Sequence, residues 1–104
     1  PCGNRNRTTV VSQSLAMLNN QFIHSRSLNL ARTLSEAYNE DKEAIFNAWK
    51  KIFSRDPESD EFKASYIHYE KQRSLFSGKD NSRLLALTSV CHVLLNSNEF
   101  LYID

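Results

Sequence analysis

The sequence predicts an all-α fold, a compact bundle of four to five helices joined by short connections. Apolar side chains recur every three to four residues through most of the chain, which is the spacing of one helix face. No segment alternates apolar and polar residues with the period of a strand, and no Asn-Gly or Asp-Gly pair marks a hairpin. With 104 residues, of which 40% are hydrophobic, the chain is long enough for one domain with one core.

The first part of the chain divides into a polar arm and one or two helices. Residues 1–7 are polar and aperiodic, so residues 8–104 are expected to form the single helical domain. Thr8 or Thr9 is a suitable N-cap, and an apolar row follows at helical spacing: Val11, Leu15, Leu18 and Phe22. Asn20 can cap a second helix with its own apolar face: Ile23, Leu30, Ala31, Leu34 and Tyr38. The pattern fits one kinked helix or two separate helices.

The most regular amphipathic helix is expected after Asn39-Glu40-Asp41. These residues offer a capping side chain and then acid in the first turn, where the helix dipole favours negative charge. One apolar stripe follows: Ala44, Ile45, Ala48, Trp49, Ile52 and Phe53. Lys50, Lys51 and Arg55 lie near its C-terminal end, where the dipole favours positive charge.

A boundary between helices is predicted at Asp56-Pro57. Asp56 would be the N-cap and Pro57 the first helical residue, because proline has no N–H to leave unpaired there. The helix that follows carries a row of aromatic side chains: Phe62, Tyr66, Tyr69 and Phe76. Gly78 is placed to end this helix in the left-handed conformation.

The last helix is expected to be the central one. Asp80 or Asn81 can cap it, and its residues are apolar almost all round: Leu84, Leu85, Leu87, Val90, Cys91, Val93, Leu94 and Leu95. Asn96-Ser97-Asn98 is predicted to stop this helix, so that residues 100–103 form a short apolar tail docked on the bundle. Burial is expected to be dominated by this helix together with four aromatic residues: Trp49, Phe22, Phe46 and Phe53.

Charge and hydropathy exclude several classes of partner. Thirteen Lys and Arg against twelve Asp and Glu give a net charge of +1, too balanced for a dedicated nucleic-acid binder, so no nucleic-acid partner is expected. No apolar run approaches the roughly 18 residues of a membrane span. The chain starts at Pro1 without Met, which suggests a fragment of a longer protein or a mature product. It shows no signal-peptide pattern.

The cysteines and histidines have no spacing typical of chemistry. Cys91 occupies a helical core position, where free cysteine is commonly a small hydrophobe, so a bridge to Cys2 is the less favoured alternative. His24, His68 and His92 are too far apart in sequence to suggest paired metal ligands. Adjacent residues of a helix point about 100° apart, so Cys91 and His92 cannot share a proton directly. No catalytic, metal or cofactor residue is predicted.

The remaining polar groups are interpreted as structural. The acids Asp56, Glu58, Asp60 and Glu61 lack the pattern of a calcium loop and fit a solvated first helical turn. Arg5, Arg7, Arg26 and Arg32 could contact phosphate or an anionic glycan, but a dispersed surface is the simpler interpretation. Two amide-rich corners, Asn19-Asn20-Gln21 and Asn96-Ser97-Asn98-Glu99, are expected to fix helix junctions. Contact of these corners and Tyr102 with a ligand or partner domain is the alternative.

Two stretches carry a family resemblance. Residues 8–22 resemble the signature "TTVxxQxLxxLNNPF", and residues 91–104 resemble the ending "ALLNSNEFLYVD", of a C-terminal region in large planctomycete proteins. Residues 52–57 stand where that family has a "LGRxPxxxE" turn. The chain thus resembles domain of unknown function family 1553, found in planctomycete surface-domain and cytochrome-c-like proteins. Gln21 replaces the usual Pro, and Ser54 replaces the usual Gly before Arg55.

The resemblance implies a non-catalytic accessory or interaction domain at the C-terminus of a large extracytoplasmic or cell-surface protein. Its partners would be other domains of the parent chain, or a protein or glycan. Many relatives attach haem upstream through a Cys-x-x-Cys-His motif. That motif is missing from this sequence, so no cofactor is expected in the fragment. The alternative is a part of a multidomain enzyme or redox protein, linked to polysaccharide or haem, whose active site lies mostly upstream.

Overall fold

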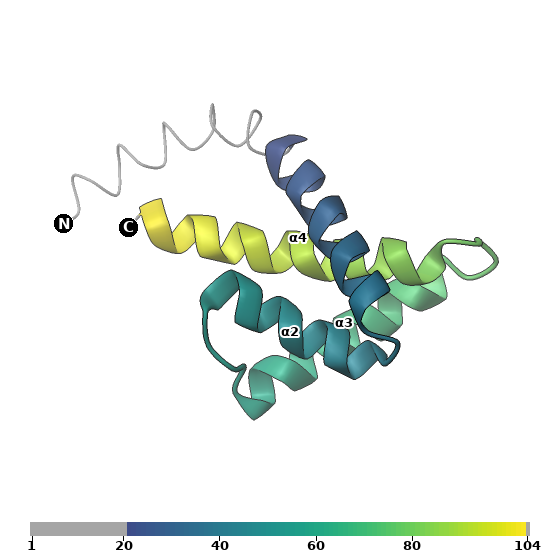
Figure 1. Ribbon diagram of the computed structural model, residues 1–104, viewed down its shortest axis with the longest axis horizontal. Coiled ribbons are helices and arrows are strands. Elements are labelled where there is room, and N and C mark those ends of the chain that lie inside the picture. The colour runs from purple at the N-terminus through teal and green to yellow at the C-terminus, as the bar shows by residue number, and fades with distance from the viewer. Residues whose placement is uncertain (1–20, 104) are drawn as a thin grey trace.

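The computed structural model describes residues 21–103, with side chains described from residue 21 to residue 97. Residues 21–37 are helical, and three further helices follow in the chain: α2 (Asp41–Phe53), α3 (Ser59–Leu75) and α4 (Ser82–Ile103). Within this part of the chain no residue is in a strand, so the predicted all-α bundle is confirmed (Figure 1). The polar arm of residues 1–7 and the predicted Thr8 or Thr9 cap lie outside the described residues.

Helix α2 forms where the amphipathic stripe predicts it. Asp41 and Glu43 lie in its first turn, and Lys50 and Lys51 lie in its last turn. Its buried face is formed by four residues: Ala44, Ile45, Ala48 and Trp49. The N-cap is Glu40, whose side chain makes no capping hydrogen bond, so the predicted capping side chain is not used. The helix ends at Ser54, which takes the left-handed conformation with φ 59° and ψ 31°. A serine therefore adopts here the backbone that glycine adopts at low cost.

Helix α3 begins later than predicted. Its N-cap is Glu58 and its first residue is Ser59, so Asp56 is not the cap and Pro57 precedes the helix. The reason is a reciprocal capping box, in which the backbone N–H of Glu58 donates to Glu61 Oε1 at 2.8 Å. At the other end Gly78 has a positive φ of 91°, as expected.

Helix α4 lies at the centre of the bundle and contacts both α2 and α3 (Figure 1). Asn81 precedes it and accepts the backbone N–H of Leu85. The prediction that Asn96-Ser97-Asn98 stops this helix is wrong, because the helix continues to Ile103 and includes the expected tail. The Ser97 hydroxyl donates to the carbonyl of Val93 at 3.0 Å. This back-bond satisfies the polar side chain without breaking the helix.

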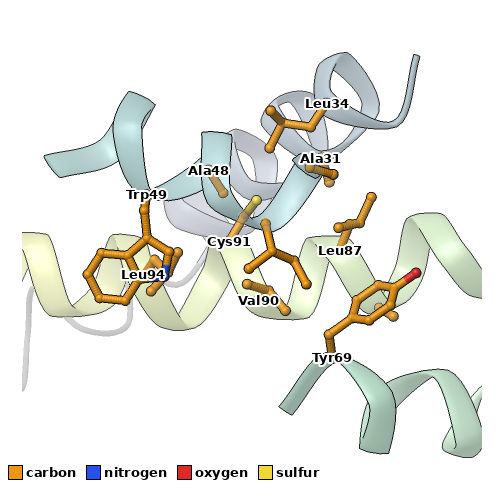
Figure 2. Packing of buried hydrophobic residues seen from close by; sticks show 12 residues of the cluster. Ala31, Leu34, Ala48, Trp49, Tyr69, Leu87, Val90, Cys91 and Leu94 are labelled. Carbon is orange, nitrogen blue, oxygen red and sulfur yellow. The ribbon is translucent and has the colours of Figure 1, made fainter. Parts of the chain in front are cut away.

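The core is made of small and aliphatic side chains around α4 (Figure 2). Four alanines are at most 1% exposed and allow the helices to approach closely: Ala31, Ala44, Ala48 and Ala86. Trp49 is buried as predicted, whereas Phe46 and Phe53 are only half-buried. Phe22 is 55% exposed, against the prediction, because it lies on the outer face of the 21–37 helix beneath the guanidinium of Arg26.

Arg83 joins the start of α4 to the end of the 21–37 helix. Its guanidinium donates to Asp41 Oδ1 at 2.7 Å and to the carbonyl oxygens of Tyr38 and Ser35 at 2.7 and 3.1 Å. A cation near a helix C-terminus satisfies carbonyls that have no partner within the helix. This contact fixes the angle between two elements that are 45 residues apart in sequence.

Candidate functional site

An open groove lies between the first half of α3 and the middle of α4. It has a volume of about 320 Å³, and Trp49 of α2 contributes to its wall. Figure 2 shows Trp49 and Leu94 side by side at this end of the core. The residues that line the groove are Trp49, Glu61, Ala64, Ser65, His68, Val90, Val93, Leu94 and Ser97. Val93 is 46% exposed, so part of the apolar lining of the groove is accessible to solvent.

A chain of hydrogen bonds holds the indole of Trp49 in place. Its Nε1 donates to the hydroxyl of Ser65 at 2.9 Å, and that hydroxyl donates to the carbonyl of Glu61 at 2.9 Å. Both groups are buried, and each has its partner within the protein. The indole therefore offers its apolar ring to the groove, while its N–H needs no partner from a ligand.

Glu61 lines one end of the groove and is paired with Arg55. Two parallel hydrogen bonds of 2.8 and 2.9 Å join the guanidinium to the carboxylate. The same guanidinium lies 5.4 Å from the ring centre of Trp49. Its hydrogen bonds, with that from the backbone of Glu58, lower the pKa of Glu61 from 4.5 to about 2. Glu61 is thus an anion with its charge already paired.

His68 joins α3 to α4 beside the groove. Its Nε2 lies 2.9 Å from the hydroxyl of Ser89. Burial, and then the nearby charge of Lys71, lower the pKa of His68 below its usual 6.5. A neutral imidazole nitrogen can accept a hydrogen bond from the Ser89 hydroxyl, so this pair links two helices. No sequence signal indicated the pair, because its members are 21 residues apart.

The groove is therefore suited to binding an apolar group. Its polar side chains have partners inside the protein: Ser65 bonds Trp49, Glu61 bonds Arg55 and His68 bonds Ser89. Ser97 likewise donates to a carbonyl of its own helix. The apolar side chains that are exposed at the groove are Ala64 and Val93, while Trp49, Val90 and Leu94 form its buried floor. Burial of exposed apolar surface favours binding by about 25 cal/mol per Å².

The other sequence candidates do not converge on this site. Cys91 is free and fully buried, and burial raises the pKa of its thiol to about 12. A thiol with that pKa is not a nucleophile near neutral pH. His92 Nδ1 lies 3.3 Å from Asn96 Nδ2, so these two side chains contact each other on the surface of α4. Cys2 lies outside the described residues.

The charged candidates are spread over the surface. Asp56, Glu58 and Asp60 are exposed near the start of α3, as expected for solvated acids. Glu61 differs from that expectation, because it is half-buried and paired with Arg55. His24 and Arg32 are exposed on the 21–37 helix, while Arg5 and Arg7 lie outside the described residues. Among the side chains from residue 21 to residue 97, no three His, Cys, Asp or Glu residues are grouped to hold a metal ion.

The two amide-rich corners do not form part of this site either. Asn19 and Asn20 lie outside the described residues, and Gln21 is the first described helical residue. Asn96 and Ser97 lie within α4 and mark no junction, against the prediction. The backbone of α4 includes Glu99 and Tyr102, but their side chains are not described.

A second groove flanks α4 on the side of the 21–37 helix. Its volume is about 340 Å³, and it is lined by Arg26, Asn29, Leu30, Lys51, Ile52 and Leu95. Its polar side chains are all exposed at the rim. It is less apolar at its edge than the groove beside Trp49, and long flexible side chains form much of that edge.

Comparison with known proteins identifies the family. The family model described as "Protein of unknown function (DUF1553)" matches residues 1–68, which include the signature stretch and the turn at Arg55. The resembling ending at residues 91–104 lies outside that match. No curated protein and no solved structure matches the chain. No helix of the described residues is long and apolar enough to cross a membrane. Since the match spans more than half of the chain, this protein belongs to the DUF1553 family.

Proposed function

We propose that this protein is a helical interaction domain whose groove beside Trp49 holds the apolar face of another polypeptide segment. The observation that supports it is the contrast between the groove's apolar surface and its internally bonded polar groups. Catalysis needs a group whose proton or lone pair can reach a substrate. In this groove the hydroxyl of Ser65, the carboxylate of Glu61 and Nε2 of His68 are already engaged.

A groove between the antiparallel helices α3 and α4 has the form of a binding site for a third helix. Ser65 and Ala64 of α3 lie across the groove from Val93 and Val90 of α4, and Trp49 lies between the helices. Amphipathic helices bind such grooves through apolar residues spaced by three or four positions. The proposed guest is therefore an amphipathic helix, supplied by another domain of the parent chain or by a partner protein.

The family resemblance suggests the setting of this domain. We place it at the C-terminus of a larger extracytoplasmic or cell-surface protein, and any haem would belong to an upstream domain. Membrane and periplasmic fractionation of the source cells, with an antibody against this domain, tests the location. Recovery of the protein in the cytosolic fraction would contradict it.

The alternative is that the domain completes an active site whose other residues lie in another domain. One observation favours it: His68, whose pKa is lowered by burial, lies at the groove wall. A neutral histidine is a potential base. If this alternative holds, His68→Gln abolishes turnover by the full-length protein while leaving its assembly intact. The binding proposal expects assembly to depend on the groove instead.

A site-specific photocrosslinker tests the binding proposal. Benzoylphenylalanine is placed at Val93 in the groove and, as a matched control, at Leu75, an apolar residue of α3 that is 74% exposed. Irradiation in the source cells should link position 93, and not position 75, to one apolar helical segment. A synthetic peptide of that segment should then shift the emission of Trp49, the only tryptophan. Equal labelling from both positions would reject the proposal.

A further inference from the structure

We infer that residues 8–20 fold back as a helix onto the second groove of the same chain, the one between the 21–37 helix, α2 and α4. The inference goes beyond the proposed function, because it concerns a different groove with a different occupant. Three observations support it: the apolar floor of this groove, the exposed side chain of Phe22 beside it, and the place where residue 20 joins the described chain.

The second groove has an apolar floor that is partly open to solvent. Leu30 and Ile52 are half-buried, and Leu95 is 7% exposed. Arg26 and Lys51 lie at the rim, and neither forms an ion pair with another described side chain. Residues 8–20 contain no Asp, Glu, Lys or Arg. Docking of this segment would therefore bury no charge on the floor and bring no positive charge to the two cations.

Phe22 lies on the same helix face as residues of this groove. Phe22, Arg26 and Asn29 follow one another at i, i+4 and i+7, and the last two line the groove. The guanidinium of Arg26 lies 5.6 Å from the ring centre of Phe22. Phe22 is nevertheless 55% exposed. The apolar strip from Phe22 to Leu30 thus spans eight residues of one helix, about 12 Å, and lacks a cover.

The apolar row of residues 8–20 has the spacing and the length of this strip. Val11, Leu15 and Leu18 are expected on one face of a helix. They span seven residues, which is about 10 Å of helix. An apolar row with this spacing is what a groove between helices accepts.

The turn between the two helices would lie at Asn19-Asn20. Two helices joined by a loop of about two to five residues run antiparallel. Asparagine suits both the end of one helix and the cap of the next. Counting outward from this turn places Leu18 opposite Phe22 and Val11 opposite Asn29. The apolar row would then lie along the groove and over the exposed ring.

The short tether favours the same chain over a second copy. Gln21 begins the described helix five residues before Arg26, so the point of attachment lies about 7.5 Å along the helix from the groove lining. Leu18 is three residues before Gln21 and stays within about 10 Å of it. A short tether that reaches its site gives an effective concentration on the order of millimolar. A second copy at micromolar concentration does not compete with that.

Crosslinking between engineered cysteines tests the inference in the full chain. Val11→Cys is combined with Asn29→Cys in a Cys2→Ser background, and a short bismaleimide joins thiols that lie close together. Cys91 does not interfere, because it is fully buried. We expect the link to form within one chain, at the mass of the monomer. The control pair, Val11→Cys with Ser74→Cys on the exposed surface of α3, should stay unlinked.

Three outcomes of this experiment would overturn the inference. A link found only between two chains would show that a second copy supplies the segment. A link from Val11→Cys to Val93→Cys instead would place the segment in the groove beside Trp49. Absence of any link to Asn29→Cys would show that the segment does not fold back, since residues 11 and 29 of one straight helix lie about 27 Å apart.

Thermal unfolding gives a second readout that depends on no particular register. If the segment covers Phe22, Phe22→Ala should lower the melting temperature by about 4 °C or more. The matched control Leu75→Ala, at an apolar residue that is 74% exposed, should shift it by less than about 2 °C. Leu18→Ala should cost less in the Phe22→Ala background than alone, because the two side chains share one contact. Equal melting temperatures of Phe22→Ala and wild type would contradict the docked segment.

The two experiments fail independently of the proposed function. Loss of the link between positions 11 and 29 leaves the photocrosslinking result at Val93 unchanged, because the second groove is a separate surface. Equal photolabelling from positions 93 and 75 would reject the proposed guest helix and leave the docked segment standing.

Discussion

The indole Nε1 of Trp49 donates a hydrogen bond of 2.9 Å to the hydroxyl of Ser65. This bond fixes the ring that forms the wall of the groove, and it joins α2 to α3 across 16 residues of sequence. The Ser65 hydroxyl in turn donates a hydrogen bond to the carbonyl of Glu61, so the indole, the hydroxyl and the backbone of α3 are connected.

Replacement of Ser65 by alanine should destabilise the protein. The buried indole N–H loses its acceptor, and an unsatisfied buried donor costs about 1–3 kcal/mol. Urea unfolding followed by circular dichroism measures the loss. Ser74→Ala, an exposed change on the same helix, should alter the free energy of unfolding by less than about 0.5 kcal/mol. Equal stability of Ser65→Ala and wild type would show that water or another group accepts the indole bond.

The ion pair between Arg55 and Glu61 should make stability depend on acid pH. The folded-state pKa of Glu61 is about 2, below its ordinary 4.5, so the pair stabilises the folded state above pH 4.5. This contribution should fade as pH falls from 4.5 towards 2. Melting temperatures of wild type and Glu61→Gln should thus differ most near pH 7 and converge near pH 2. A gap that stays constant between pH 7 and pH 2 would show that protonation of Glu61 is not involved.

Ser54→Gly should stabilise the protein by about 0.5–1 kcal/mol. The serine has a φ of 59°, where side chains with a Cβ are strained by about 1–2 kcal/mol, and glycine's freedom in the unfolded chain offsets part of the gain. Thermal unfolding measures the difference. The same change at Ser74, in the last turn of α3, should instead cost up to about 0.5 kcal/mol, because glycine has a lower helix propensity than serine. Loss of stability in both variants would contradict the strain at position 54.

Arg83→Met should cost about 1.5–3 kcal/mol, because the carbonyls at the end of the 21–37 helix and Asp41 lose their charged donor. Arg83→Lys should recover only part of this loss, since an ammonium group lacks the guanidinium's fork of donors. Chemical denaturation of both variants, with exposed Arg32→Met as the control, gives the comparison. If Arg83→Lys were as stable as wild type, the positive charge alone would account for the stabilising effect of Arg83.

Cys91 should resist alkylation in the folded protein. Its thiol is fully buried, and burial raises its pKa to about 12, so very little thiolate forms at pH 8. Iodoacetamide treatment followed by peptide mass spectrometry should leave the Cys91 peptide unmodified, and denaturant should expose it. Rapid labelling in native buffer would mean that α4 separates easily from the bundle.

The sequence alone determined the helices because their apolar periodicity is local. The apolar stripe from Ala44 to Phe53 predicts α2. The apolar residues around Cys91 predict a central last helix, because a helix that is apolar on every side is normally enclosed by its neighbours. Gly78 also indicated its turn, because glycine adopts a positive φ at the lowest cost. Helix ends were less predictable. The capping hydrogen bond to Glu61 places the start of α3 at Ser59 instead of Pro57. The hydrogen bond of the Ser97 hydroxyl to a carbonyl of its own helix allows α4 to continue through Asn96, Ser97 and Asn98.

Which distant groups contact each other depends on how the helices pack. Nothing near Ser65 in the sequence indicates Trp49, and the same holds for His68 with Ser89 and for Arg83 with Tyr38. The groove exists because α3 and α4 part where Trp49 lies between them, and that separation depends on the crossing angles of whole helices. Periodicity states which face of a helix is apolar. The shapes of all the packed faces together determine which part of that surface remains open.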